Sequence, residues 1–569
     1  MASEKLKTPK AQLIVENGLV YSTSDRKNPV SFAQLAGGQK ITRKLDQKPA
    51  AKRAAEFTVI GKSPVRVDAR AKVTGKAQYA GDLRFPDMLY AKVLRPPAHG
   101  ATLKSVDTSL AEKISGVLVV KEEDLIAVLA SDPETAEKAR SAIKAEFDTP
   151  DADVDEQSIF DVILRKAPKP QQSERRGDLA AGEKAAVTLF EQTYLNGYGA
   201  HASIETHTAC ARFDGDKMTV WISTQTPFPN QQAIARALKL PNEKVRIITP
   251  YVGGGFGGKS AIPQALEAAR LAKIAGKPVQ VSFNRDEEFF YDTFRPAAIV
   301  RIRSGLDSSG KICLWDNHIY YAGSRSAEDF YDVPNNLMST YGNWMMDMSK
   351  VHPFNIGAWR APGANINVFA RESQIDIMAA KLKMDPLEFR LKNTSDARMR
   401  RVLETAARSF GYTPAASPSR RGYGIDCGID AGSYVAEIAE VKVDQGKVKV
   451  KRILAAQDMG ICVNPEGSKM QMEGCIMMGL GYALSEDIHF KGGKVLTTNF
   501  HNYAVPRFSW MPEIDVILVK NDELDPQGGG EPAITPVGGA IANAVFDATG
   551  IRVFQMPMTA ERINKAAKA

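Results

Sequence analysis

The stretch "TPYVGGGFGGKSAI" (residues 249–262) lies between two segments of different character and indicates the class of fold. "KVRIIT" before it has the β-branched residues of a strand, and "PQALEAARLAKIAGKPV" after it has the pattern of a helix. Pro263 suits the first turn of that helix, and Gly276 with Pro278 marks its end. From Gly253 to Ser260 the loop fits the phosphate-loop pattern G-x-x-x-x-G-K-[ST]. Taken alone, this motif predicts a nucleotide hydrolase, which the rest of the chain must support.

Strand and helix signals interleave along the remaining sequence. "CARFDGDKMTVWI" predicts a hairpin turning at Asp214-Gly215, and "AEVKVDQGKVKVKRI" predicts another turning near Gly446. "RESQIDIMAAKLKMDPLEFRLKN" predicts a long amphipathic helix interrupted at Asp385-Pro386, and "QLIVENGLVYS" predicts a single short strand. The expected fold class is therefore α/β (α+β).

The composition is that of a soluble globular protein with several domains. The chain has 569 residues, of which 44% are hydrophobic and 25% charged, so it can bury large cores. The net charge of +8 is small for this length, and we expect no nucleic-acid partner. The basic cluster "KITRKLDQKPAAKR" (Lys40 to Arg53) is interpreted as a solvated linker.

The five cysteines and the apolar runs exclude several further classes. No C-x-x-C spacing occurs, which argues against a disulfide framework, a zinc site or an iron–sulfur cluster held by this chain alone. "MASEKLKTPK" lacks an apolar signal region, so we expect no signal peptide on this chain. "CIMMGLGYAL" is too short to cross a bilayer, and no direct membrane insertion is expected. Cytoplasm and periplasm both remain open.

Four glycine-bearing segments argue against the nucleotide hydrolase. They are "TPYVGGGFGGKS", "NIGAWRAPGAN", "SKMQMEGCIMMGLGYAL" and "GGGEPAITPVGGAIANAV". A phosphate hydrolase needs one such loop and a strand that ends in a magnesium-binding Asp. Phe256 is also bulky for a loop that closes around phosphates. Several loops whose backbones permit close approach favour one large ligand that is contacted from many sides.

In this order, "STQTPF", "GGGFGGK", "AWRAPG", "QMEG" and "GGGEP" resemble the molybdenum-cofactor subunit of the xanthine dehydrogenase/aldehyde oxidase family, particularly its isoquinoline oxidoreductase-like branch. The resemblance extends from Phe57 onward and more loosely before it. It implies a hammerhead-like α/β domain followed by two elongated mixed α/β cofactor-binding domains. The expected divisions are an extension and linker at 1–56, the hammerhead-like domain at 57–184, and the cofactor-binding domains at 185–415 and 416–569.

The resemblance also implies a role for single residues. Glu531 is similar to the family's catalytic base, since a carboxylate in a dry site can take up a proton near neutral pH. Phe228, Trp359 and Tyr434 are candidates for an apolar substrate pocket. A core aromatic remains an alternative for Phe256, and a structural ion pair remains one for Arg360. The expected cofactor-binding residues are Gln225, Gly254, Gly255, Phe256, Gly257, Arg360, Ala361, Gln471, Glu473 and Gly530.

The expected cofactor is molybdenum bound by a molybdopterin cytosine dinucleotide. In the family the pterin dithiolene holds the metal, so no protein ligands are expected. "HASIETHTAC" offers His201, Glu205, His207 and Cys210, but their spacing fits no familiar metal site, and a strand with buried polar groups is the favoured interpretation. Ile204-Glu205-Thr206 also departs from the family's Met-Glu-Pro, which puts the substrate-side role of this stretch in doubt.

The resemblance implies oxidative hydroxylation of an N-heteroaromatic or aldehyde carbon, with water as the oxygen source. Electrons would pass to a separate subunit with [2Fe-2S] clusters, and a flavin or cytochrome subunit is compatible with this scheme. The family's Gly-Gln-Gly segment is absent before "TPKAQLIVENGLVYS", so a further small subunit is expected to supply it. The alternatives are a phosphate-loop nucleotide hydrolase and a non-catalytic scaffold of the same fold.

Overall fold

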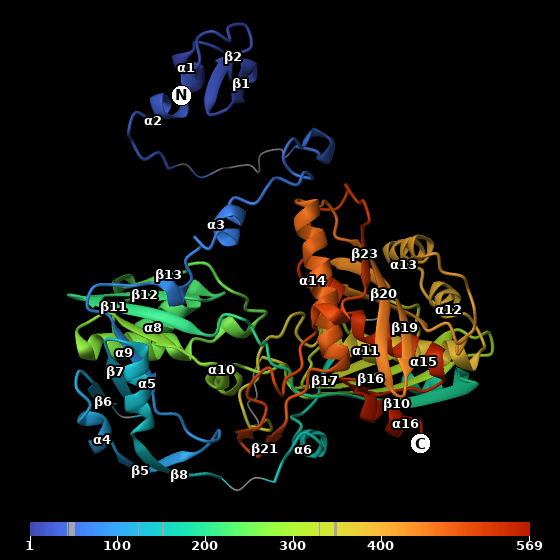
Figure 1. Ribbon diagram of the computed structural model, residues 1–569. Coiled ribbons are helices and arrows are strands. Elements are labelled where there is room, and N and C mark those ends of the chain that lie inside the picture. Colours follow the sequence, from blue (N-terminus) through green and yellow to red (C-terminus); the bar gives the residue numbers. More distant parts are fainter. Residues whose placement is uncertain are drawn as a thin grey trace. The chain divides into compact units, whose positions relative to one another are not determined.

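The computed structural model describes residues 1–42, 44, 52–122, 124–150, 153–328, 330–345 and 350–568. They form two compact units, Met1–Phe57 and Thr58–Ala569 (Figure 1). Much of the stretch that we interpret as a linker, residues 43 and 45–51, lies outside the described residues. The mixed α/β class expected from the sequence is confirmed.

The first unit is a small sheet with one capped helix. Strands β1 (Leu13–Glu16), β2 (Leu19–Ser22) and β3 (Val30–Ser31) pair in that order, and α2 (Phe32–Ala36) follows them. "QLIVENGLVYS" therefore forms two strands and not the single strand we expected. Asn17 and Gly18 both have positive φ, and they turn the chain between β1 and β2.

A seven-stranded sheet joins early and later parts of the second unit. Its middle contains the parallel pair of β4 and β14, which lie almost 200 residues apart in sequence. Helices α5 (Pro133–Ser141), α8 (Pro227–Leu238) and α9 (Pro263–Ala275) pack on this sheet. Gly276 ends α9 with a φ of 62°, as its position in the sequence suggested. In order, the strands are β13 (Val245–Ile248), β12 (Lys217–Ile222), β11 (Thr208–Asp214), β14 (Val279–Ser282), β4 (Leu89–Val93), β7 (Leu125–Ala130) and β6 (Leu118–Glu122).

A six-stranded and a four-stranded sheet form the remainder of the second unit, together with the short pairs β5 (Thr102–Asp107) with β8 (Lys144–Asp148) and β21 (Phe490–Lys491) with β22 (Lys494–Val495). Both predicted hairpins are confirmed, as β11–β12 and β19–β20. The six strands are, in order, β24 (Gln555–Met556), β10 (Thr188–Asn196), β15 (Ala298–Leu306), β16 (Ile312–Tyr320), β17 (Asn336–Tyr341) and β9 (Gln171–Arg176). The four are β18 (Tyr423–Asp430), β19 (Ser433–Asp444), β20 (Lys447–Asp458) and β23 (Glu513–Leu518).

Four longer helices surround these sheets. Helix α11 (Ala364–Lys381) contacts β10 and β15 of the six-stranded sheet and β18 of the four-stranded sheet. Helices α13 (Ala397–Phe410) and α15 (Val537–Thr549) pack on the four-stranded sheet, and α14 (Pro465–Leu484) contacts α15 and β23. The shorter helices are α1 (Ala2–Lys5), α3 (Ala69–Val73), α4 (Ser109–Glu112), α6 (Ile159–Lys166), α7 (Leu179–Ala185), α10 (Arg285–Tyr291), α12 (Pro386–Lys392) and α16 (Ala560–Ala566).

The helix expected over this stretch is confirmed as α11, but its amphipathic character is wrong, because α11 is buried nearly all round. Fifteen of its 18 residues are buried. The charged side chains of this stretch mislead because they are neutralised inside the protein: Arg371 of α11 and Arg390 of α12 both bind Glu372 at 2.9 Å. The predicted interruption is present, since α12 begins at Pro386 after the capping residue Asp385.

Two other buried acids have no such partners. Asp426 of β18 lies directly opposite Glu437 of β19, and both are fully buried. Within the described part of the chain, none of their four carboxyl oxygens has a hydrogen-bond partner. Burial raises the pKa of both acids well above the usual range, so both carboxyl groups are protonated and neutral.

None of the helices in the described ranges is long and apolar enough to cross a membrane.

Candidate functional site

A pocket of about 560 Å³ lies where the glycine-bearing segments meet. Its walls come from the loop between β13 and α9, the turn before α11, the first half of α14 and the segment before residue 532. The lining residues are Gln225, Phe256, Gly257, Ser260, Arg325, Trp344, Ala358, Arg360, Pro362, Met470, Gln471, Gly474, Gly530 and Glu531.

Seven of the expected site residues line this pocket, although they are spread over 300 residues of sequence. They are Gln225, Phe256, Gly257, Arg360, Gln471, Gly530 and Glu531. Gly254 and Gly255 belong to the same loop but are not among the lining residues, and Ala361 is fully buried. Glu473 is exposed on α14 and does not line the pocket.

The glycine loop has a conformation that only glycine tolerates at its centre. Gly257 has a φ of 119°, and a Cβ there would lie 1.9 Å from the Ala358 carbonyl oxygen. Phe256 before it has a positive φ of 53° and a side chain that is 41% exposed. It is therefore a wall residue and not the core aromatic that was the alternative. The Gly257 N–H donates to Gln225 Oε1 at 3.0 Å.

Lys259 of the phosphate-loop pattern is not available to a nucleotide. It is fully buried, and its ammonium donates to Glu205 Oε2 at 2.6 Å. The same carboxylate oxygen accepts from the Gly253 N–H, also at 2.6 Å. Glu205 therefore links Lys259, at one end of the loop, to Gly253 at the other, and the role of the lysine is structural. This placement removes the hydrolase as an interpretation of the motif.

Two histidines of "HASIETHTAC" complete the charged layer beneath the loop. His201 Nδ1 donates to Asp292 at 2.8 Å and its Nε2 donates to the Ala358 carbonyl at 2.6 Å. Because both ring nitrogens face acceptors, His201 is a cation. Burial opposes this charge, but Asp292 outweighs it and raises the pKa of His201. His207 forms a similar pair with Glu288, at 3.0 Å, and its pKa is also raised.

The strand expected over residues 201–210 is correct only from Thr208, where β11 begins, because residues 201–207 form a loop. The expected buried polar groups are present, and they explain the difference: their hydrogen bonds go to Glu288 of α10 and to Asp292 directly after it, instead of to a strand partner. Among the described residues, no group of three or more His, Cys, Asp or Glu side chains forms a metal site.

Arg360 fixes the opposite wall. Its guanidinium donates from Nε and Nη2 to the Gly530 carbonyl, at 3.0 and 2.6 Å, and from Nη2 to Gln471 Oε1 at 2.8 Å. These partners are neutral, so the ion pair considered for Arg360 is absent within the described structure. Its Nη1 group has no hydrogen-bond partner among the described residues and is free to bind a ligand.

Glu531 shares one arginine with a buried acid. Arg325, in the loop after β16, binds Asp430 at the end of β18 in a bidentate pair of 2.7 and 2.9 Å. Its Nη2 group also donates to the Glu531 carboxylate. Burial disfavours the charged guanidinium, but the two acids raise the pKa of Arg325 and hold it as a cation. Arg325 was not predicted from the sequence, because it lies in no glycine motif and its contacts are more than 100 residues away along the chain.

The three residues expected to line a substrate pocket do not line this one. Phe228 is 77% exposed on α8. Trp359 is fully buried, and its indole N–H donates to the Ala200 carbonyl at 3.0 Å. Tyr434 donates to Asp396, and the Arg398 guanidinium lies 4.1 Å from its ring centre. The apolar side chains of the wall are instead Phe256, Trp344, Pro362 and Met470.

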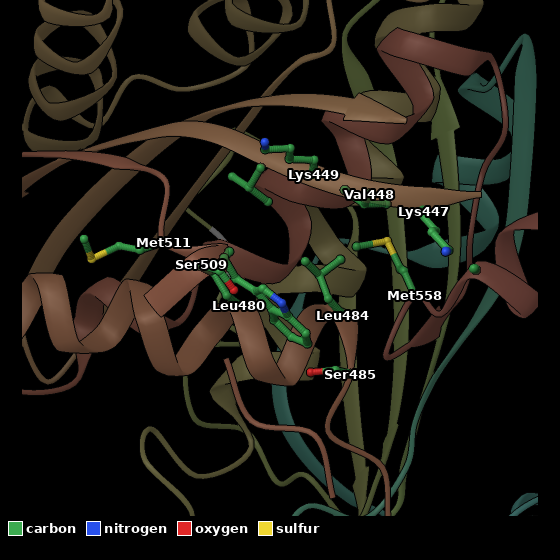
Figure 2. Close-up of a pocket in the computed structure, with 12 residues that line it drawn as sticks. Lys447, Val448, Lys449, Leu480, Leu484, Ser485, Ser509, Met511 and Met558 are labelled. Atoms are coloured by element: carbon green, nitrogen blue, oxygen red, sulfur yellow. The ribbon is translucent and has the colours of Figure 1, made fainter. Parts of the chain in front are cut away.

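A second pocket of about 400 Å³ lies at the other end of α14 and contains none of the expected site residues. Figure 2 shows Lys447, Val448 and Lys449 of β20 on one side, and Leu480, Leu484 and Ser485 of α14 on the other. Met558 lies at one end of the pocket and Met511 at the opposite end. None of the described residues that line this pocket is an acid that could act as a base, so the candidate site remains the pocket with Glu531.

Two family models match this chain in succession. Residues 165–394 and 371–512 each correspond to a model described as a molybdopterin cofactor-binding domain. Together they extend over more than half of the chain and include the walls of the pocket up to Gln471 and Gly474. The chain belongs to the xanthine dehydrogenase/aldehyde oxidase family. As a member of it, the chain is a molybdopterin-binding protein of the oxidoreductase type.

Individual relatives agree with this family. A nicotinate dehydrogenase chain of Pseudomonas putida, named as one subunit of that enzyme, is 28% identical over 99% of this chain, which spans only about half (51%) of that protein's length. The beta chain of isoquinoline 1-oxidoreductase from Brevundimonas diminuta is also 28% identical, over 90% of this chain and 69% of the relative. The crystal structure of quinoline 2-oxidoreductase from Pseudomonas putida 86 has a TM-score of 0.80 at 17% identity, covering 90% of this chain and 98% of that one. This last similarity supports the fold.

Proposed function

We propose that this chain is the catalytic subunit of a molybdenum hydroxylase that oxidises an sp² carbon of an N-heteroaromatic compound or an aldehyde. One observation carries this proposal: the pocket combines a carboxylate in its wall, Glu531, with polar side chains that keep N–H donors without a partner among the described residues. The three relatives named above are all oxidoreductases or dehydrogenases, and their names refer to N-heteroaromatic compounds.

The residues of the pocket fit a pterin cofactor. The amide oxygens of Gln225 and Gln471 are used by the Gly257 N–H and by Arg360, which leaves both NH₂ groups free among the described residues. Gly474 and Gly530 line the pocket, and the nearest atom to an added Cβ would be 3.6 and 3.8 Å away. Their bare backbone lets a flat ligand approach closely. Gln225, Gln471 and Arg360 would therefore hold the cofactor by hydrogen bonds.

The bound molybdenum cofactor would supply the oxygen-transfer and two-electron chemistry that side chains lack. Glu531 is the only carboxylate of the pocket wall among the described residues, and it would accept the proton released from the oxygen that enters the substrate. Arg325 would orient that carboxylate, and Asp430 would in turn orient Arg325. Trp344 and Met470 would contact the substrate at the mouth of the pocket.

We further propose that the cofactor is the cytosine dinucleotide form and that electrons leave through a separate subunit with [2Fe-2S] clusters, and from there through a flavin or cytochrome subunit. Two of the relatives are named as single subunits of their enzymes, which supports a multi-subunit enzyme here. The chain's own five cysteines support a separate iron–sulfur subunit, since four of them are buried at different places. The divisions at 56, 184 and 415 remain our proposed domain boundaries.

The test begins with metal analysis of the purified protein and identification of the released pterin. Turnover of quinoline, nicotinate and benzaldehyde with an artificial electron acceptor follows. Glu531→Gln should keep the metal and lower turnover by about 10²–10⁴-fold, because an amide of equal volume cannot accept a proton. If the variant with full metal content turns over at the parent rate, Glu531 is not the base. A protein that never contains molybdenum would instead favour the non-catalytic scaffold.

A further inference from the structure

One buried glutamate, Glu486, has no role in the proposed reaction. Glu486 follows the end of α14 and is only 5% exposed. Its backbone N–H donates to the Gly481 carbonyl at 2.9 Å, which folds the chain back on the helix. A Cβ at Gly481 would lie 1.9 Å from the Glu486 carboxyl oxygen, so glycine is required for the carboxyl group to lie there.

Tyr503 joins this carboxyl group to the backbone of Ala200. The Tyr503 hydroxyl lies 3.0 Å from Glu486 Oε2 and 3.1 Å from the Ala200 carbonyl oxygen, and it accepts from the Ala200 N–H at 3.0 Å. A phenol has a single proton to donate. When Glu486 is ionised, this proton goes to the carboxylate. When Glu486 is protonated, the carboxyl group can donate to the phenol oxygen and the phenol proton goes to the Ala200 carbonyl.

Ala200 and His201 hold the turn that carries Arg360. The Trp359 indole N–H donates to the Ala200 carbonyl at 3.0 Å, and His201 Nε2 donates to the Ala358 carbonyl at 2.6 Å. The backbone N–H of the next residue, Arg360, donates to the Phe256 carbonyl at 2.9 Å. A continuous series of hydrogen bonds therefore runs from Glu486 through Tyr503 and Ala200 to the turn whose arginine lines the pocket.

We propose that Glu486 is a positioning residue for the turn Ala358–Arg360, and that the proton on its carboxyl group decides whether Tyr503 binds Ala200 at one backbone group or at two. With the proton present, Tyr503 accepts from the Ala200 N–H and donates to its carbonyl. Without it, only the first of these bonds remains. The turn is therefore held more firmly at lower pH. This inference rests on the proposed function only for the role given to Arg360.

The surroundings of Glu486 place this change near neutral pH. Burial raises the pKa of Glu486 to about 7, while the Tyr503 hydroxyl and the Arg295 guanidinium oppose the rise. Arg295 is itself buried, and its guanidinium lies 4.8 Å from the Trp359 ring centre and 4.6 Å from that of Tyr482. The neighbouring Asp487 is paired with Arg562 of α16 at 2.7 Å. Arg295 is thus the cation that interacts electrostatically with ionised Glu486, and its guanidinium also lies over the ring of Trp359.

Hydrogen–deuterium exchange tests the inference without any turnover. The amide of Ala200 and that of Arg360 are the reporters, because both belong to the series of hydrogen bonds. After correction for intrinsic rates, their exchange in the whole protein should be several-fold faster at about pH 8 than at about pH 6, on either side of the Glu486 pKa. Glu486→Gln cannot ionise, so it should abolish this pH dependence, and Tyr503→Phe should give fast exchange at both pH values.

Tyr482→Phe is the matched control, since Tyr482 is equally buried and its hydroxyl has no hydrogen-bond partner among the described residues. It should leave the pH dependence as in the parent. The inference is overturned if Glu486→Gln keeps the parent's pH dependence, or if Tyr482→Phe abolishes it as Tyr503→Phe does. In active preparations, kcat/KM of the parent should change between the same pH values and that of Glu486→Gln should not. A protein inactive on every substrate would contradict the proposed function but leave the exchange result standing.

Discussion

At Glu531 the carboxylate that we assign as the base is bound to a cation, and that cation is bound to a second acid. Asp430 is fully buried at its side chain, whereas Glu531 is 40% exposed in the pocket. Asp430 is the stronger of the two acidic partners of Arg325, and the shared guanidinium orients Glu531 in the pocket. An arginine shared in this way can hold a base in one place and still leave it able to accept a proton.

Replacing Arg325 should lower turnover without removing the cofactor. Within the described residues Arg325 is the side chain that binds the Glu531 carboxylate, so in Arg325→Met the base loses its orientation and kcat should fall by roughly 10–10²-fold. Arg325→Lys keeps the charge but loses the bidentate pair with Asp430, so it should retain part of the activity. Steady-state kinetics at full metal content measures both. Parent-like turnover in Arg325→Met would show that the contact has no influence on the base.

The sequence predicted some site residues well and others not at all, for a physical reason. Glu531 and Gln471 lie in short motifs whose glycines are needed for close approach, so the local sequence carries the signal. Arg325 becomes a site residue only because Asp430 and Glu531, far along the chain, lie beside it. Trp359 was expected in the pocket because of its motif, but its indole N–H donates to the Ala200 carbonyl, whereas its neighbour Arg360 lines the pocket.

Among the structural elements, the glycine loop depends on the charged layer beneath it. Lys259 and Glu205 are a buried pair, with 0% and 14% of their side chains exposed. Lys259→Met should lower the free energy of unfolding by about 3–5 kcal/mol, because it leaves the Glu205 charge buried without a partner. The double variant Lys259→Met/Glu205→Gln should recover part of this loss, since the uncompensated charge is gone.

Chemical denaturation of both variants measures this effect. Binding of ATP to the parent, followed by calorimetry, provides the contrast. A phosphate-binding lysine would lose nucleotide affinity on replacement and would show little change in stability. That outcome would contradict the structural role given to Lys259.

Glu437, in the paired strands β18 and β19, should lower the stability of the folded protein at neutral pH. The pKa of Glu437 is raised well above its usual value by burial, so the folded protein must keep this group protonated. Stability is then highest below the unfolded pKa of about 4.3 and falls as the pH rises toward the folded value. Glu437→Gln removes this cost. Its melting temperature should exceed that of the parent by roughly 2 °C or more near pH 8, with no difference below about pH 4.

Thermal melts over this range test the prediction, and Asp426→Asn should behave in the same way because its pKa is also raised. A constant difference between Glu437→Gln and the parent at every pH would contradict it, since that would show an effect of packing rather than of ionisation.

Predictions for helices and strands were most accurate where the turn residues and the spacing of the apolar residues indicate the same element. Both hairpins and the end of α9 at Gly276 were correct because Asp-Gly and Gly residues set the turns locally. Helix α11 was misjudged because its charged residues mimic a solvent-facing side, although Glu372 lies between two arginines in the core. The pattern of charges in a sequence does not distinguish an exposed ion pair from a buried one.

At the scale of the whole molecule, one sheet of the second unit extends across the proposed boundary at residue 184. The seven-stranded sheet takes β4, β6 and β7 from one side of this boundary and β11 to β14 from the other. The sequence did not predict the pairing of β4 with β14, because parallel strands distant in sequence leave no local signal.

The first unit, in contrast, should be removable. Among the described residues, the hydrophobic clusters of the second unit contain none before Leu89, and the first unit buries its own Val20 and Val30. Deletion of residues 1–57 should therefore leave the melting temperature and the molybdenum content unchanged, as calorimetry and metal analysis would show. Deletion of residues 1–94 also removes β4 from the sheet and should prevent folding. A large loss of stability in the shorter deletion would contradict this division.

The pocket walls contain two kinds of side chain, and the difference has an evolutionary consequence. Arg360 donates to Gln471 and to the Gly530 carbonyl, and Arg325 binds Asp430 and Glu531. A change in any of these side chains therefore disturbs several segments at once. Phe256 and Met470 are apolar, partly exposed and bound only by packing. Mutation can alter this second set at little cost to the first. Descendants of this protein could therefore acquire new substrates by exchanging rim residues, while the inherited chemistry of the site stays intact.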